Sequence, residues 1–179
     1  MTHHDQPWSR RIALADVPDE GLHVALEADA EVRATLARTA GLRDLPRLEA
    51  SFDVRRRGAG LHIEGEVLAV VGQNCVVSLE PIEGNLHEVI DLVFASDLPE
   101  TMGGGVGETS FGLADAEPPE PLVGGVVDLG AIATEYFLLG IDPYPRKEGV
   151  VFEGGAAPEP GESPFAGLAA LKKPPQGRK

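Results

Sequence analysis

One cysteine is the residue best suited by type to do chemistry in this chain. Cys75 lies in residues 72–82, between two segments of alternating apolar residues. It could act as a nucleophile, as a zinc ligand together with His23, His62 or His87, or as a small apolar side chain in a tight turn. The histidines lack the spacing of a zinc site, and no Cys-His-Asn arrangement can be assigned. The sequence therefore favours the third role, a partly buried side chain at a turn.

Two further motifs have the residue types of a binding site. Residues 103–109 (GGGVGET) superficially resemble a phosphate-binding loop, but the lysine of that motif is missing and no predicted strand leads into it. We therefore interpret them as flexible. Arg55, Arg56 and Arg57 lie at a predicted hairpin tip, where they either form a solvated turn or contact RNA. No pair of carboxylates is isolated in an apolar setting, so we predict no catalytic residue, no metal and no cofactor.

The charge of the chain limits its partners. The 179 residues carry a net charge of −14, most of it between residues 81 and 171, while the last eight residues are basic. A field of this sign repels a phosphate backbone and favours a basic protein as partner. No apolar run approaches the ~18 residues of a membrane span, and the N-terminus lacks the apolar segment of a secretory signal. We expect a cytoplasmic protein without membrane contact or small-molecule substrate.

Hydrophobic periodicity predicts an α+β fold built on an antiparallel sheet of about five strands. Alternation with period two predicts strands at residues 8–14, 22–26, 47–55, 61–71 and 86–94. Helical spacing, capped by Asp29 and closed by Gly41, predicts a short helix over residues 30–40. A second helix, which we expect to cover the sheet, occupies residues 128–139, with Asp128 as its N-cap.

Composition sets the expected domain boundaries. We predict one domain over residues 1–153, interrupted by a mobile acidic insertion at residues 97–125 that is rich in glycine and proline. Residues 154–179 form a linker and a tail that contains a helical motif. Its apolar stripe either docks on its own domain or binds a partner. The stripe consists of Phe165, Leu168 and Leu171.

Three short segments together resemble the YceD-type family, a domain of unknown function. Residues 75–81 (CVVSLEP) resemble the family's Cys-x-x-Cys-Leu-x-Pro turn, and residues 128–139 with the prolines that follow resemble its Asp-Leu-led helix and exit. Residues 164–172 (PFAGLAALK) are similar to its terminal Asn-Pro-Phe-x-x-Leu-x-x-Leu-Lys motif. Ser78 replaces the second cysteine of the turn, and the cysteines that many members carry after the helix are absent here. A zinc site inferred from the family is therefore unsupported.

The resemblance implies a non-enzymatic factor in ribosome assembly that promotes accumulation of 23S ribosomal RNA of the large subunit. Its partner would be a ribosomal protein of that subunit or an rRNA precursor. The family turn motif corresponds to Cys75, Ser78, Leu79 and Pro81. The partner-binding residues that the terminal motif implies are Pro164, Phe165, Leu168, Leu171 and Lys172.

Two other functional classes fit the same sequence. The first is an acidic adaptor that binds a partner unrelated to ribosomes through its acidic loop and terminal helix. The second is a hydrolase or redox protein that depends on Cys75. A partner-binding protein agrees best with the acidic charge.

Overall fold

A computed structural model describes residues 7–96 and 119–152 of the chain. The chain divides into two units, Met1–Lys147 and Glu148–Lys179, and all described helices and strands lie in the first. This boundary falls a little before residue 153, where the sequence placed the end of the domain. The glycine-rich residues 103–109 and the terminal motif at residues 163–173 lie outside the described residues.

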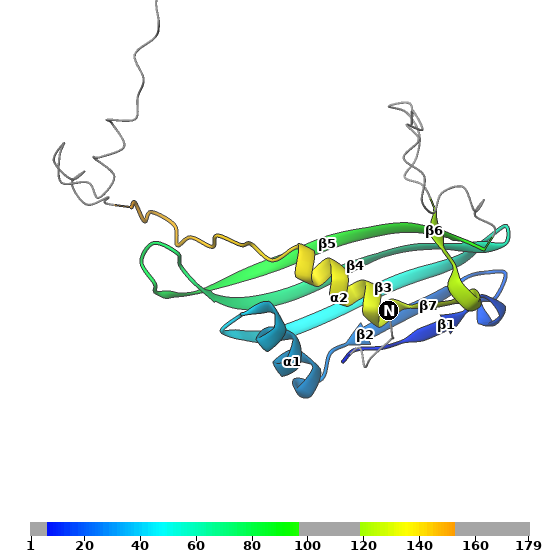
Figure 1. Ribbon diagram of the computed structural model, residues 1–179, viewed down its shortest axis with the longest axis horizontal. Helices are drawn as coiled ribbons and strands as arrows, with labels where there is room; N and C mark the ends of the chain where they lie inside the picture. Colours follow the sequence, from blue (N-terminus) through cyan, green and yellow to red (C-terminus); the bar gives the residue numbers. More distant parts are fainter. Residues whose placement is uncertain (1–6, 97–118, 153–179) are drawn as a thin grey trace, which may run out of the picture. The chain divides into compact units, whose positions relative to one another are not determined.

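The main sheet has five strands in the order β2-β3-β4-β5-β6 (Figure 1). Neighbouring strands among the first four pair antiparallel, whereas β6 pairs parallel with the end of β5, so the sheet is mixed. The predicted α+β class with a mostly antiparallel sheet is confirmed. The strands are β2 (Leu22–Glu27), β3 (Asp44–Arg57), β4 (Gly60–Asn74), β5 (Pro81–Ala95) and β6 (Glu120–Pro121).

The opening strand does not belong to this sheet, contrary to the prediction. β1 (Arg11–Ala13) pairs instead with β7 (Val126–Asp128) in a separate two-stranded sheet. Asp128 explains this pairing, because its carboxylate accepts hydrogen bonds from Ser9 Oγ at 2.5 Å and from the Arg10 N–H at 2.8 Å. The fifth strand of the main sheet is β6, which the sequence did not predict.

The predicted acidic insertion extends too far at its C-terminal end. Residues 97–118 lie outside the described part of the chain, but residues 120–125 form β6 and the 3-10 helix η3 (Val123–Gly125). Leu122 explains the difference, because its side chain is buried in the core and its N–H donates to the Ala95 carbonyl at 2.9 Å. A second 3-10 helix, η1 (Leu14–Asp16), follows β1.

Both predicted helices are confirmed. α1 (Ala30–Ala40) begins where Asp29 accepts a hydrogen bond from the Val32 N–H, and it ends at Gly41 with a left-handed φ of 66°. α2 (Leu129–Leu139) begins where Asp128 accepts from the N–H groups that start its first turn. Asp128 thus caps α2 and holds β1 at the same time.

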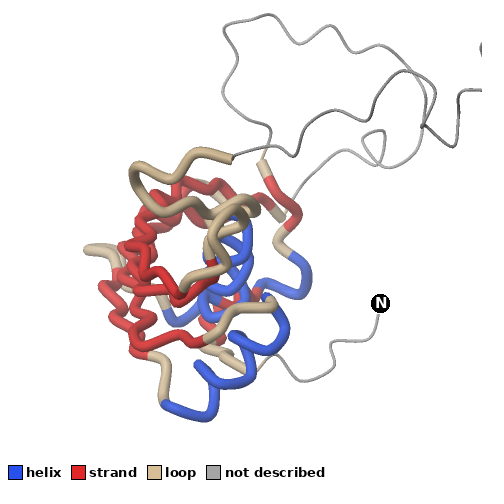
Figure 2. The backbone as a smooth tube through the Cα atoms, turned by 90° about the vertical axis from the view of Figure 1, so that its left-hand side faces the viewer, coloured by secondary structure: helices blue, strands red, loops and turns tan. Residues whose placement is uncertain are grey.

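Both helices cover the same face of the sheet (Figure 2). Leu36 of α1 and Phe137 of α2 belong to one apolar core with Phe52 and Ile63 from the inward side of the strands. Side chains alternate between the two faces of a strand, so the opposite set of residues points away from the helices. We call this side of β2, β3, β4 and β5 the outer face. No described helix covers it.

Candidate functional site

Cys75 lies in the turn between β4 and β5, where its sulfur is enclosed as a hydrogen-bond acceptor. The side chain is 0% exposed, rather than partly buried as predicted. The backbone N–H groups of Val77 and Ser78 donate to Sγ at 3.4 Å each. The Lys147 N–H donates a third hydrogen bond at 3.3 Å, from a segment remote in sequence.

The segment that leaves α2 holds this turn in place. The carbonyl of Asp142 accepts a hydrogen bond from Gln73 Nε2, and the carbonyl of Pro145 accepts one from the Val76 N–H, both at 2.9 Å. The Lys147 ammonium binds Glu80 at 2.8 Å, so one residue contacts the turn through both its main chain and its side chain. The sequence did not predict Lys147 as a partner of Cys75, because seventy-two positions separate the two residues.

These donors favour the ionised form of the sulfur. The Lys147 N–H is the main cause, followed by the Ser78 hydroxyl and the Ser78 N–H, and together they lower the pKa of Cys75 from 9.0 to about 6. Burial opposes this shift more weakly. The lowered pKa favours a hydrogen-bonded thiolate at neutral pH.

The arrangement around Cys75 does not assemble a nucleophile with a base, or a zinc site. The side chain that donates to its sulfur is the Ser78 hydroxyl, which cannot serve as a general base, and the sulfur is shielded from solvent. Within residues 7–96 and 119–152, no group of three or more His, Cys, Asp or Glu side chains could hold a metal ion. The three histidines considered as ligands lie instead on the outer face.

Each of these histidines contacts a carboxylate across neighbouring strands of the outer face. The nearest nitrogen and oxygen atoms are 3.1 Å apart for His23 and Asp53, 2.7 Å for His62 and Asp91, and 2.9 Å for His87 and Glu66. These pairs are exposed to solvent to different degrees, with His62 the most covered. They form a repeated pattern across four adjacent strands.

Carboxylates dominate this face. Asp53, Glu64 and Asp91 lie directly opposite one another in a row across β3, β4 and β5, and Arg55 binds the central Glu64 at 2.7 Å. Opposed like charges are unfavourable, so the row depends on its flanking cationic and imidazole groups. The acidic residues of the outer face are Glu27, Glu49, Asp53, Glu64, Glu66, Glu83 and Asp91, and its arginines are Arg47, Arg55 and Arg57.

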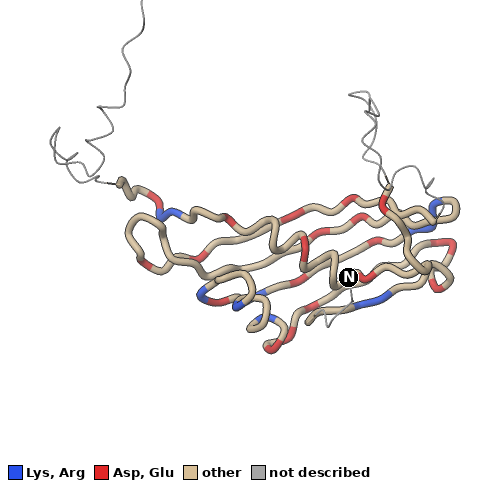
Figure 3. The backbone as a smooth tube through the Cα atoms, in the orientation of Figure 1, with Lys and Arg blue, Asp and Glu red and all other residues tan. Residues whose placement is uncertain are grey.

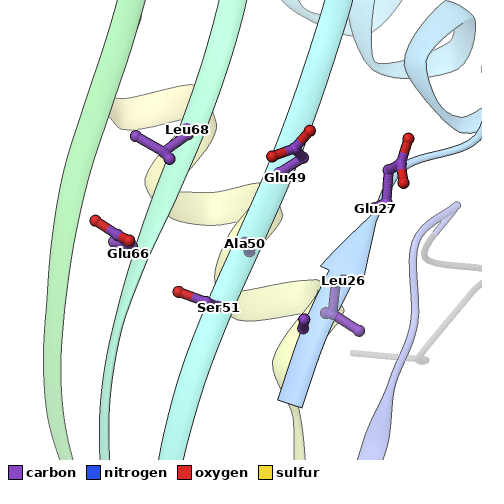
Figure 4. A pocket seen from close by; sticks show the side chains of 8 residues that line it. Leu26, Glu27, Glu49, Ala50, Ser51, Glu66 and Leu68 are labelled. Atoms are coloured by element: carbon purple, nitrogen blue, oxygen red, sulfur yellow. The ribbon is translucent and has the colours of Figure 1, made fainter. Parts of the chain in front are cut away.

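A shallow depression of about 490 Å³ lies on the outer face over β2, β3 and β4 (Figure 4). Carboxylates of Glu27, Glu49 and Glu66 line it, and Leu68 lies beside them on β4, opposite Glu49. Arg47 donates two hydrogen bonds to Glu49, at 2.6 and 2.5 Å, and thereby lowers the pKa of that carboxyl. The lining suits a cationic side chain better than an anion.

The predicted arginine run is divided between the two faces of β3. Arg55 is paired with Glu64, and Arg56 donates to the carbonyls of Val17 and Ala15 at 2.6 and 3.1 Å. Figure 3 shows acidic positions along the long strands and basic positions mostly near strand ends and on β1. Among the described residues, the run therefore does not form a continuous basic surface.

The other residues of the turn motif are less buried than Cys75: Ser78 is half-buried, whereas Leu79 and Pro81 are exposed. Leu79 is 75% exposed and has a φ of 60°, which is unusual for a residue with a side chain. Ser78 accepts from the Glu80 N–H at 3.4 Å, and Pro81 begins β5. The predicted partner-binding residues Pro164, Phe165, Leu168, Leu171 and Lys172 lie outside the described residues.

Comparisons of the chain with protein-family models, curated proteins and solved structures give no match. Within the described ranges, no helix has the length and apolar character needed to cross a membrane.

Proposed function

We propose that this protein is a non-enzymatic assembly factor that promotes accumulation of 23S ribosomal RNA by binding a basic protein of the large ribosomal subunit. The observation that carries the proposal is the acidic outer face, which no described helix covers. Its carboxylates outnumber its arginines, and the whole chain has a net charge of −14. Such a surface attracts basic proteins and accelerates their association.

The sequence resemblance supports the ribosomal part of the proposal. Residues 75–81, 128–139 and 164–172 follow the order of the family's motifs. The enclosed sulfur of Cys75 supports a structural rather than a catalytic role for the turn. RNA is the less favoured direct contact, because two of the three residues in the Arg55–57 run bind groups of the protein itself.

Recovery of partners on the tagged full-length protein tests the direct contact. We expect the wild-type chain to recover a basic large-subunit protein, and the triple variant Glu64→Gln, Glu66→Gln, Asp91→Asn to recover several-fold less. The matched control removes three exposed charges elsewhere, by Asp19→Asn, Glu20→Gln and Glu135→Gln, and should bind as the wild type does. Recovery of free RNA without ribosomal protein would contradict the proposed contact.

A strain that lacks the gene tests the biological role. Mature 23S RNA should decrease and its precursors should accumulate relative to 16S RNA. Unchanged 23S RNA, combined with recovery of a non-ribosomal basic protein, would instead indicate an acidic adaptor unrelated to ribosomes.

A further inference from the structure

β5 has an open edge along most of its length. One side pairs with β4 from Pro81 to Phe94, whereas on the other side β6 pairs only with Phe94 and Ala95. No other strand among residues 7–96 and 119–152 pairs with β5. Within these ranges, no strand pairs with the main-chain N–H and C=O groups on this side between residues 83 and 93, so they can pair with another strand.

The geometry identifies the residues that present these groups. The Ala95 carbonyl accepts from the Leu122 N–H at 2.9 Å, on the β6 side. The hydrogen-bonding groups of successive residues alternate between the two sides of a strand, and the pairing of β4 with β5 has no register shift. The open side is therefore formed by the odd-numbered residues of β5, including His87, Val89 and Asp91.

Exposed apolar side chains flank this edge. Val89 is 69% exposed on the outer face, and Leu139 is 75% exposed at the end of α2. The end of α2 lies beside β5, because a Cβ atom on Gly140 would be 2.5 Å from Glu88 Oε1. Natural proteins usually shield long edges of this kind.

The charge of the β5 edge determines which kind of strand it can bind. β5 carries Glu83, Glu88 and Asp91, with no lysine or arginine. Glu88 is half-buried opposite Val67, on the side of the helices, and inward carboxylates of this kind disfavour pairing with another acidic strand. A second copy of this chain would bring the same carboxylates to the edge, whereas a basic segment would neutralise them.

We propose that the edge of β5 binds an extended, lysine- or arginine-rich segment of a protein partner as an added strand. This mode of binding rests on the proposed function for the basic character of the partner and specifies how that partner is held. Main-chain hydrogen bonds supply the affinity, and alternate side chains of the segment meet Asp91 and Val89 on the outer face. Cationic residues next to the carboxylates supply the selectivity.

Binding of synthetic peptides to the full-length protein tests the proposal. The probe is a fluorescent peptide of about ten residues with alternating lysine and valine, which matches a typical strand. We expect saturable binding, while a glutamate–valine peptide and a lysine–valine peptide with methylated alternate backbone nitrogens should not bind. The methylated peptide keeps the charge but loses main-chain donors, so it separates strand pairing from simple charge attraction.

Substitutions at one position of β5 provide the matched pair. Val89→Pro removes an N–H on the open side without affecting the β4 ladder, and should weaken binding about tenfold or more. Val89→Ala keeps the N–H, and its affinity should stay within about threefold of the wild type. On binding, the amide protons of His87, Val89 and Asp91 should exchange more slowly.

Several results would overturn the proposal. These are equal binding of the methylated peptide, unchanged binding by folded Val89→Pro protein, and a dimer of the free protein that Val89→Pro dissociates. If Val89→Pro does not fold, binding of the methylated peptide to the wild-type protein decides.

Equal recovery of a large-subunit protein by wild-type and Val89→Pro chains would retain the proposed function and reject strand addition. Binding of the peptide at the edge, together with unchanged 23S RNA in the strain that lacks the gene, would retain strand addition and reject the proposed function.

Discussion

Cys75 shows how the environment of one atom changes its chemistry. A thiol covered by apolar atoms would stay protonated, but this sulfur accepts main-chain hydrogen bonds from Val77, Ser78 and Lys147. These donors are satisfied best by a thiolate. The same contacts that close the turn therefore link its stability to proton binding.

The first prediction is that the free energy of unfolding depends on the ionisation of Cys75. The pKa of Cys75 is about 6 in the folded protein, below its ordinary value of 9.0, so the unfolded chain binds more protons between these values. The stabilisation is fully present above about pH 9, decreases as the pH falls, and is lost below about pH 6. Denaturant unfolding of the wild type and of Cys75→Ser at several pH values should show this difference.

The comparison must separate Cys75 from other titrating groups. The pKa values of Glu49 and Glu80 are lowered, and those of Arg47 and Lys147 are raised, so these four residues titrate outside this range in the folded protein. Groups that both proteins share cancel in the difference. A wild-type minus Cys75→Ser stability difference that does not change between pH 6 and pH 9 would contradict the prediction.

At the scale of elements, close packing between β3 and β4 depends on a missing side chain. Gly65 lies opposite Phe52, and a Cβ atom there would be 2.4 Å from the Ser51 carbonyl oxygen and 2.8 Å from the Phe52 ring. The main-chain oxygen cannot move without disturbing the strand pairing, and the Phe52 ring lies against the glycine. An added methyl group would therefore crowd the contact between β3 and β4.

We predict that Gly65→Ala decreases the free energy of unfolding by about 1 to 3 kcal/mol, because the added methyl group overpacks the core. The matched control is Gly84→Ala in β5, where the new Cβ would meet only Val71 Cγ2 at 3.6 Å. Its stability should be unchanged or increase by about 0.5 kcal/mol through lower entropy of the unfolded chain. Equal effects at both sites in thermal or denaturant unfolding would contradict this account of the packing.

Local sequence signals predicted the bounds of the helices better than they predicted which remote segments pair. Asp29, Gly41 and Asp128 act within a few residues, so the bounds of α1 and the start of α2 could be inferred from spacing alone. The pairing of β1 with β7, and of Leu122 with Ala95, joins remote segments through hydrogen bonds that no periodicity encodes.

The candidate surface could be predicted only in part, because it too combines local patterns with contacts between remote segments. The alternation of β3 and β4 placed His62 and Glu64 on the outer side of the sheet. The row formed by Asp53, Glu64 and Asp91 requires the register between three strands, which the sequence did not supply. The contact of Lys147 with Cys75 likewise depends on how the exit from α2 is directed.

At the scale of the whole molecule, charge distribution makes binding at the outer face sensitive to salt. At neutral pH its seven carboxylates face the guanidinium groups of three arginines. The face is therefore negative and attracts a cationic partner, and dissolved ions weaken this attraction by screening the exposed charges.

The last prediction is that binding of the lysine–valine peptide to the full-length protein weakens about tenfold when the salt concentration at pH 7.5 rises from about 0.05 to 0.5 M, because dissolved ions screen the carboxylates of the outer face. The triple variant Glu64→Gln, Glu66→Gln, Asp91→Asn carries three fewer negative charges on this face. Its affinity should therefore be lower at about 0.05 M salt and should change much less with salt. Equal salt dependence in the two proteins would show that these carboxylates do not supply the charge that the partner meets.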